Sequence, residues 1–232
     1  MRSHVPFRKR KMKTRKPAIS EGVDREDEEP AREAKTRDAA APKAVRADAQ
    51  RNVDALLEAA LAVFATSGVD APVREIAVKA GVGVGTLYRH FPQRSDLIAA
   101  VFRREVDACA TAAVALAAEH APGEALARWM QRYAAFIATK RGLAAALHSG
   151  DPAFDSLPGY FKERLQPALR SLLDAGVAAG EIRADVAPNE LLKAVGSLCM
   201  SARDLAPEYA RRMVALLVDG LRFGASGRNG AA

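Results

Sequence analysis

The chain has 232 residues, 49% of them hydrophobic and only 6% aromatic, so it can bury the core of one large domain or two small ones, and its many alanines favour helices. Its net charge of +7 is uneven, because residues 1–45 hold 13 Lys and Arg against 8 Asp and Glu and the remainder is nearly neutral. No apolar run reaches the ~18 residues of a membrane span, and no hydrophobic signal core follows the basic start, which argues against membrane and secreted proteins.

Residues 1–44 are predicted to be a disordered, charged tail. A basic block at 8–16 precedes an acidic block at 21–29, prolines interrupt any helix, and large apolar residues are too few for a core. Such a basic run can bind the phosphates of a nucleic acid. It can equally be a solvated extension, or result from a start codon assigned too early, and we favour these two interpretations.

A first long helix is predicted from Val45 to Ser67, and Gly68 ends it. Apolar side chains recur there at steps of three and four and form one stripe along the helix: Val53, Leu56, Leu57, Ala60, Leu61 and Phe64.

The stretch Val73 to Pro92 predicts two short helices joined by a tight turn. Ile76 and Ala77 fall at helical spacing on the first helix, and Gly81 can adopt the left-handed backbone that the turn needs. Leu87 faces inward on the second helix, which Pro92 stops. This is the pattern of a helix-turn-helix, whose second helix enters the major groove of DNA.

Residues 46–98 closely resemble the N-terminal DNA-binding domain of the TetR family of transcriptional regulators. The resemblance rests on the long first helix, on IAVKAGV (76–82), on TLYRHF (86–91) and on a capped helix near Ser95. It implies an all-α fold of about nine helices, with the DNA-binding domain at 45–92, an effector-binding and dimerisation domain at 93–225 and a disordered end at 226–232.

The same resemblance implies a function. The expected protein is a cytoplasmic bacterial regulator, most often a repressor, that binds a palindromic operator in double-stranded DNA as a homodimer. It is nucleoid-associated when bound to DNA, and a small, largely hydrophobic effector releases it. No cofactor, metal or membrane partner is expected.

The resemblance places the DNA contacts on the first helix and around the helix-turn-helix, at Arg46, Arg51, Arg74, Gly85, Thr86, Tyr88, Arg89, His90 and Arg94. Arg74 is the best candidate for a base reader, because arginine binds guanine through two hydrogen bonds; a phosphate contact or a solvated side chain is the alternative. Tyr88 and His90 resemble the family's phosphate clamp, although either could instead belong to the core.

Gly83, Val84 and Gly85 depart from the family pattern. Positions that could carry base-reading side chains are small or apolar here, so direct readout is expected to be thin, and backbone contacts or DNA shape carry more of the specificity. Arg94 stands where the family usually has lysine, so its phosphate contact can differ in geometry.

Six further helices are predicted after the helix-turn-helix, at about Ser95–His120, Glu124–Thr139, Lys140–Leu147, Tyr160–Ala179, Asn189–Arg203 and Glu208–Phe223. Ser95 is the expected N-cap of the first, with Asp96 at the positive end of its dipole. In the family this helix joins the DNA-binding domain to the effector domain. Pro167 is expected to kink or break the Tyr160–Ala179 helix.

Large side chains gather in the middle of the predicted effector domain, where the family forms its ligand pocket. The stretch Trp129 to Ser149 is similar to SbtR-like regulators. An aromatic-rich pocket with few polar groups would suit a hydrophobic molecule, although stripes at helical spacing are usually core. The pocket candidates are Phe102, Val106, Trp129, Met130, Tyr133, Phe136, His148, Phe161, Leu165 and Cys199.

The last two predicted helices are the expected dimer seam, by resemblance and by their own residues. They carry more apolar surface than one short helix usually buries, and two copies could pack as a four-helix bundle. The alternative is that they only close the core of the monomer. The interface candidates are Leu191, Val195, Leu198, Met213, Leu217 and Leu221.

Two other classes of protein stay open. The first is an effector-independent architectural or nucleoid protein, which would show weak sequence preference and a salt dependence that is lost with the tail. The second is an enzyme on a helical bundle. His148 and Asp151 could form an acid–base pair and Cys109 or Cys199 a nucleophile, but no nucleophile or metal motif surrounds them.

Overall fold

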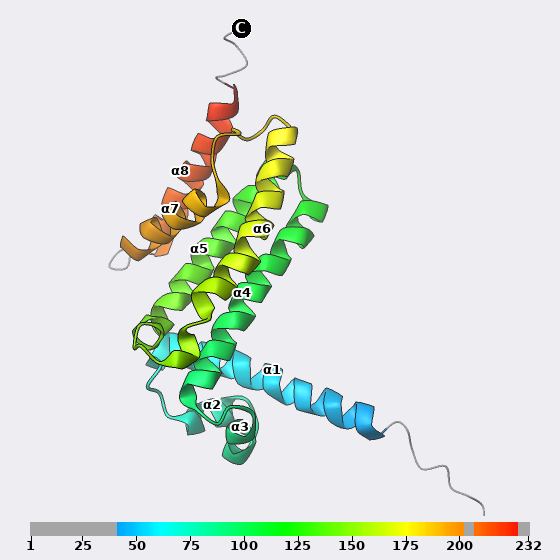
Figure 1. Ribbon diagram of the computed structural model, residues 1–232, viewed down its shortest axis with the longest axis vertical. Helices are drawn as coiled ribbons and strands as arrows, with labels where there is room; N and C mark the ends of the chain where they lie inside the picture. The colour runs from blue at the N-terminus through cyan, green and yellow to red at the C-terminus, as the bar shows by residue number, and fades with distance from the viewer. Residues whose placement is uncertain (1–40, 202–206, 227–232) are drawn as a thin grey trace, which may run out of the picture. The chain divides into compact units, whose positions relative to one another are not determined.

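The computed structural model describes residues 41–201 and 207–226 and most of their side chains (Figure 1). In these ranges the chain is built from helices and contains no strand, which confirms the all-α prediction. The predicted tail lies almost wholly outside the described residues. The elements are α1 (Ala41–Ser67), α2 (Val73–Lys79), α3 (Val84–His90), α4 (Arg94–Glu119), α5 (Pro122–Leu147), the 3₁₀ turn η1 (Pro152–Phe154), α6 (Leu157–Ala178), α7 (Pro188–Ser201) and α8 (Pro207–Ser226).

Helix α5 runs without a break, where the sequence predicted two helices meeting at residues 139–140. Leu143 is buried two turns after Phe136, so the same apolar stripe crosses the predicted boundary. This continuity explains why residues 41–201 and 207–226 form eight α-helices, close to the nine or so predicted.

Several helix starts also differ from prediction. Helix α1 extends back to Ala41, and α6 begins at Leu157 and passes through Pro167 uninterrupted. The residue that precedes α4 is Gln93 and not Ser95; its backbone N–H donates to Oδ2 of Asp96 at 2.9 Å. The carboxylate of Asp96 therefore satisfies a backbone N–H at the positive end of the helix dipole.

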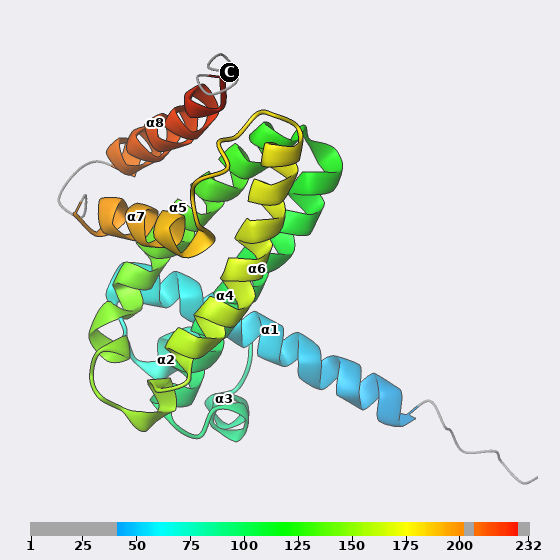
Figure 2. The same ribbon diagram turned by 45° about the horizontal axis from the view of Figure 1, so that its top comes forward.

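Helix α4 belongs to two groups of helices. It runs beside α5 and α6, while α7 and α8 lie against α5; α1, α2 and α3 gather at its N-terminal end (Figures 1 and 2). One hydrophobic core is continuous through both groups. Helix α4 therefore links the helical bundle to the helix-turn-helix. None of the described helices combines the length and the apolar character needed to cross a lipid bilayer.

Candidate DNA-binding surface and effector cavity

The connection between α2 and α3 has the geometry of a helix-turn-helix. Gly81 has a φ of 69°, the left-handed conformation expected of it, and the N–H of Val82 donates to the carbonyl of Ala77 at 3.0 Å. Ile76 and Leu87 are buried between the helices. Because Leu87 is the buried residue of α3, the rest of that helix is presented at the surface.

The presented surface is positively charged. From Arg74 to Arg94 the sequence holds Arg74, Lys79, Arg89 and Arg94 against Glu75 alone. Arg74 and Arg89 are exposed, and Thr86 and His90 are half-buried. Tyr88 is 49% exposed, which argues against a place in the core. Exposed cations beside a hydroxyl and an imidazole are groups that bind phosphate oxygens.

Arg94 fastens the start of α4. It is half-buried, and its Nη1 donates to the carbonyl of Val69, in the loop between α1 and α2. A guanidinium has several N–H groups, so this bond leaves others for a phosphate. Arg51 is exposed and pairs with Asp48 one turn earlier in α1. The side chain of Arg46 lies outside the described residues.

Two glycines, Gly83 and Gly85, leave the N-terminal end of α3 without side chains at these positions. A Cβ added at Gly83 or Gly85 would meet no atom within 4 Å, and neither residue has a positive φ. The fold therefore does not require glycine at either position. Because these two residues have no side chain, another molecule can approach the backbone at the start of α3 closely.

A cavity of about 600 Å³ opens between α5, α6 and α7. Pockets for small molecules usually measure ~300–1,000 Å³. Its apolar wall consists of Tyr133, Ile137, Phe161, Leu192 and Met200. Its remaining lining residues are Lys162, Gln166, Asn189, Lys193, Gly196 and Ser197.

Both parts of the molecule match known proteins. The model of bacterial regulatory proteins of the tetR family matches residues 56–101, and the model of the SbtR-like transcriptional regulator C-terminal domain matches residues 121–223. The TetR transcriptional regulator SCO0520 from Streptomyces coelicolor is 38% identical, over 73% of this chain and 98% of that chain, with a TM-score of 0.64. The chain belongs to the TetR family of transcriptional regulators. Its helix-turn-helix is that of the family's DNA-binding domain.

Other relatives agree with this assignment. A TetR regulator from Mycobacterium vanbaalenii is 36% identical over 77% of this chain and 99% of that chain, with a TM-score of 0.60. The HTH-type transcriptional regulator SAUSA300_2515 from Staphylococcus aureus is 41% identical over 64 residues, 27% of this chain, and the match spans only 35% of that relative. LfrR from Mycobacterium smegmatis, solved in complex with proflavine, shares the fold at 23% identity, with a TM-score of 0.54 over 77% of this chain and 96% of that chain.

The cavity of this TetR-family chain is lined by two of the residues predicted for the pocket, Tyr133 and Phe161. His148 is exposed in the turn after α5. Trp129 packs in the core, stacked on Tyr133 at 5.7 Å between ring centroids, and its Nε1 donates to the carbonyl of Cys109 at 2.9 Å. The other predicted pocket residues are also buried in the core, behind or beside the cavity wall: Phe102, Val106, Met130, Phe136, Leu165 and Cys199.

Sequence reasoning missed the polar lining of the cavity. Asn189, Lys193 and Ser197 recur at steps of four along α7, with Gly196 beside Ser197, and the four residues form one stripe. That spacing was visible in the sequence, but it is equally typical of a solvated helix face. Only the packing of α7 against α5 and α6 shows that the stripe borders a cavity.

The buried thiol of Cys109 and the buried phenol of Tyr133 contribute to packing and not to chemistry. Burial raises the pKa of the Cys109 thiol to about 12, so the reactive thiolate is scarce. Burial also raises the pKa of Tyr133, whose hydroxyl donates to the carbonyl of Leu192 at 3.2 Å. Within residues 41–201 and 207–226, no cluster of three His, Cys, Asp or Glu side chains could hold a metal ion.

A chain of aromatic rings joins the cavity to α4. The ring of Phe161 on α6 lies 6.1 Å from that of Phe136 on α5, and Phe136 lies 5.9 Å from Phe102 on α4, measured between centroids. Both distances fall in the ~4.5–7 Å range of favourable aromatic pairs. The wall of the cavity and the helix that carries the helix-turn-helix are therefore in packing contact.

A polar cluster joins the same turn of α6 to α4. Asp107 on α4 accepts hydrogen bonds from Oη of Tyr160 at 2.6 Å and from Nε of Arg164 at 2.7 Å. Burial and the bond to Asp107 raise the pKa of Tyr160. Arg103 on α4 donates to Oγ of Ser156, just before α6, at 2.9 Å. Two independent kinds of contact thus hold α4 against the helix that borders the cavity.

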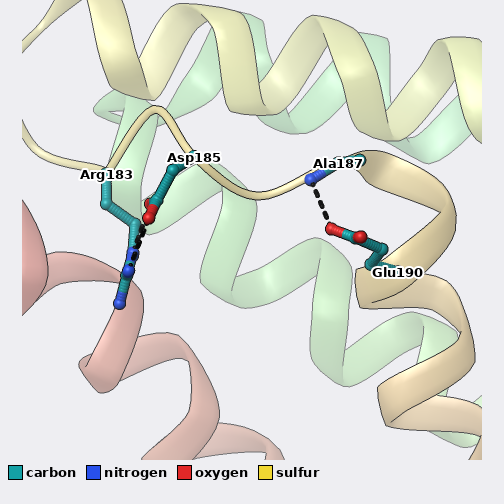
Figure 3. Close-up of polar contacts among 4 residues, drawn as sticks. All are labelled: Arg183, Asp185, Ala187 and Glu190. Carbon is teal, nitrogen blue, oxygen red and sulfur yellow. Dashed lines mark hydrogen bonds and ion pairs between the residues drawn. The ribbon is translucent and has the colours of Figure 1, made fainter.

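Hydrogen bonds hold the connector between α6 and α7, which leads into the start of α7 (Figure 3). Arg183 donates two hydrogen bonds to Asp185, at 2.5 and 2.7 Å, and its backbone N–H donates to the carbonyl of Leu221 on α8 at 3.0 Å. The N–H of Ala187 donates to Oε2 of Glu190 at 3.1 Å, which satisfies a backbone group at the start of α7.

The residues predicted for the dimer seam divide into two sets. Leu191, Val195 and Leu221 are buried within their own subunit, because the apolar stripes of α7 and α8 face α5 and α6, so their contacts are already made. Leu198, Met213 and Leu217 are half-buried. The most exposed large apolar residues of these helices are Leu216, which is 56% exposed, Tyr209 at 45% and Met200 at 43%.

Proposed function

We propose that this regulator represses transcription as a homodimer that binds a palindromic operator and is released by a small, largely hydrophobic molecule. Residues 45–92 form the DNA-binding domain and residues 93–225 the effector and dimerisation domain. The observation that carries the proposal is the cavity of about 600 Å³, which ring contacts connect to α4. Helix α4 begins at Arg94, directly after α3 ends at His90.

On the DNA side, α3 lies in the major groove. Arg74 reads a base edge from the first turn of α2, while Tyr88 and Arg94 contact phosphates. The exposure of Arg74 and Tyr88 and the excess of cations around α3 support this arrangement. Because Gly83 and Gly85 offer no hydrogen-bonding side chain, backbone contacts and DNA shape carry much of the sequence preference.

The switch works through packing. A ligand in the cavity displaces Phe161, and the rings of Phe136 and Phe102 pass the displacement to α4. A close-packed interior is not continuously deformable, so a displaced side chain causes a discrete rearrangement of its neighbours. When α4 moves, the separation of the two α3 helices in the dimer no longer matches successive major grooves, which lie about 34 Å apart.

The dimer forms along α7 and α8. Leu216 is 56% exposed, and Leu217, Gly220 and Leu221 of α8 line a groove with Ala194 of α7. A two-fold pair of such surfaces is self-complementary and can pack as a four-helix bundle. Two reading helices are needed because one helix-turn-helix contacts too little DNA to specify a site.

The test begins with selection of bound sequences from random double-stranded DNA by the full chain. We expect a palindromic site, a dimer in sedimentation at micromolar concentration, and release of the operator by some members of a panel of small apolar molecules. Gly196→Leu should weaken release, because its side chain occupies part of the cavity while its Cβ meets only Oη of Tyr133, at 3.9 Å. A monomer with weak sequence preference that depends on residues 1–44 would instead support an architectural protein.

A further inference from the structure

The polar lining of the cavity is cationic. Lys162 on α6 and Lys193 on α7 both border it, and no Asp or Glu is among the residues that line it. The remaining polar groups are the amides of Gln166 and Asn189 and the hydroxyl of Ser197. All of these groups can donate hydrogen bonds, and the two ammonium groups cannot accept any.

Within the described residues, no ion pair joins Lys162 or Lys193 to a carboxylate. Helical neighbours three or four positions away could do so, but for Lys162 these positions hold no acid. For Lys193 the acid is Glu190, whose carboxylate accepts the N–H of Ala187 instead (Figure 3).

The rest of the cavity is an apolar wall. Ile137, Phe161, Leu192 and Met200 supply aliphatic and aromatic surface, and Tyr133 adds the face of its ring, since its hydroxyl is bonded to the carbonyl of Leu192. Asn189 lies in the first turn of α7, where the peptide dipoles add partial positive charge. The cavity therefore combines an apolar wall with two lysines that, in the part of the chain that the structure describes, have no carboxylate partner.

We propose that the effector is an amphipathic organic anion: its apolar or aromatic body packs against Phe161 and Tyr133, and its carboxylate, sulfonate or phosphate lies between Lys162 and Lys193. This inference rests on the proposed effector function of the cavity and narrows it to one chemical class. A cationic or neutral body of the same size leaves both ammonium groups without a counter-charge and is bound more weakly.

Two fluorescent probes of nearly the same skeleton test the charge requirement: anilinonaphthalene sulfonate, an anion, and phenylnaphthylamine, which is neutral. Both are titrated into the full chain and into the Lys162→Gln/Lys193→Gln variant. The variant should bind the anion about tenfold more weakly, as two lost exposed ion pairs allow, and the neutral probe within about twofold of wild type. Added salt should weaken anion binding in wild type but not in the variant.

Two further variants assign the effect to the cavity. Gly196→Leu, which places a side chain inside the cavity, should weaken binding of both probes. Arg128→Gln, which removes an exposed charge on α5 at its pair with Glu124, should leave the binding of both probes unchanged. Circular dichroism and thermal melting confirm that each variant is folded. The inference would be overturned by unchanged anion binding in the double lysine variant, by equal loss of both probes in that variant, or by unchanged binding of both probes in Gly196→Leu.

The proposed function fails by a different result. If neutral molecules released the operator from wild type and from the lysine variant alike, the anionic class would be wrong and the switch would stand. If no occupant of the cavity changed operator affinity, the switch itself would be wrong.

Discussion

Gly85→Ala should change stability and DNA binding in opposite directions. Gly85 lies inside α3 without a positive φ, and an added Cβ would meet nothing within 4 Å, so alanine fits the free protein without a clash. Alanine is favoured over glycine in a helix by about 0.5–1 kcal/mol, and the free energy of unfolding should rise by that amount. If the bare front of α3 faces the DNA, the new methyl group meets the duplex, and overpacking of a close contact costs about 1–3 kcal/mol.

Stability is measured by urea unfolding and binding by fluorescence anisotropy on the selected operator. A loss of 1–3 kcal/mol corresponds to about fivefold to 150-fold weaker binding. Gly159→Ala on α6 is the matched control, because its Cβ also meets nothing within 4 Å, and it should leave operator affinity unchanged. Wild-type affinity for Gly85→Ala would show that α3 does not approach the DNA through its glycine face.

Other predictions concern the remaining surfaces. Arg74→Ala should cost ~1–3 kcal/mol and relax preference at one base pair per half-site in competition assays, whereas Arg94→Ala should weaken all sequences alike and reduce the salt dependence; equal, sequence-independent losses would make Arg74 a phosphate contact. Gly176→Ala should lower the free energy of unfolding in urea by ~1–3 kcal/mol despite better helix propensity, because its Cβ would lie 2.5 Å from Cγ1 of Ile182 and 3.1 Å from its Cβ; a rise would contradict this. Leu216→Glu should give a folded monomer in sedimentation with severely weakened operator binding, and a persistent dimer would place the seam elsewhere.

The helix-turn-helix could be predicted because its determinants are local. Gly81 at the turn and Leu87 on the second helix have roles set by sequence neighbours, and both lie where the spacing places them. The N-cap of α4 was misplaced by two residues, at Ser95 and not at Gln93, and the hydrogen bond from the backbone N–H of Gln93 to Asp96 decides between them.

The effector cavity could not be located in the same way, because its wall is chosen by tertiary packing. Trp129 and Tyr133 lie one turn apart on α5, yet Tyr133 borders the cavity while Trp129 is bonded to Cys109 in the core. On α8, Leu221 faces inward and Leu216 outward, although both are leucines of one amphipathic helix. The periodicity of the sequence predicts which face of a helix is apolar, but the residues that pack against this face depend on how the whole bundle is assembled.

One turn of α6 contacts both the cavity and α4. Phe161 and Lys162 border the cavity, while Tyr160 and Arg164 on the same turn hold Asp107 of α4. If a ligand displaces this turn, the contacts to Asp107 must shift with it, so Asp107 should transmit ligand occupancy to α4. Asp107→Asn keeps the size of the side chain but weakens both bonds, since neither is any longer made to a charged acceptor.

We therefore expect Asp107→Asn to reduce coupling while leaving both binding events in place. Ligand affinity without DNA and operator affinity without ligand should stay within about threefold of wild type, because the bonds are partly exposed. The loss of operator affinity caused by a releasing ligand should shrink, and the loss of ligand affinity caused by operator should shrink equally, since coupling free energy is reciprocal. Arg128→Gln, whose pair with Glu124 stays within α5, is the control. Full release of operator from Asp107→Asn would show that the contacts of Asp107 do not carry the signal, and would leave the aromatic rings as the proposed route from the cavity to α4.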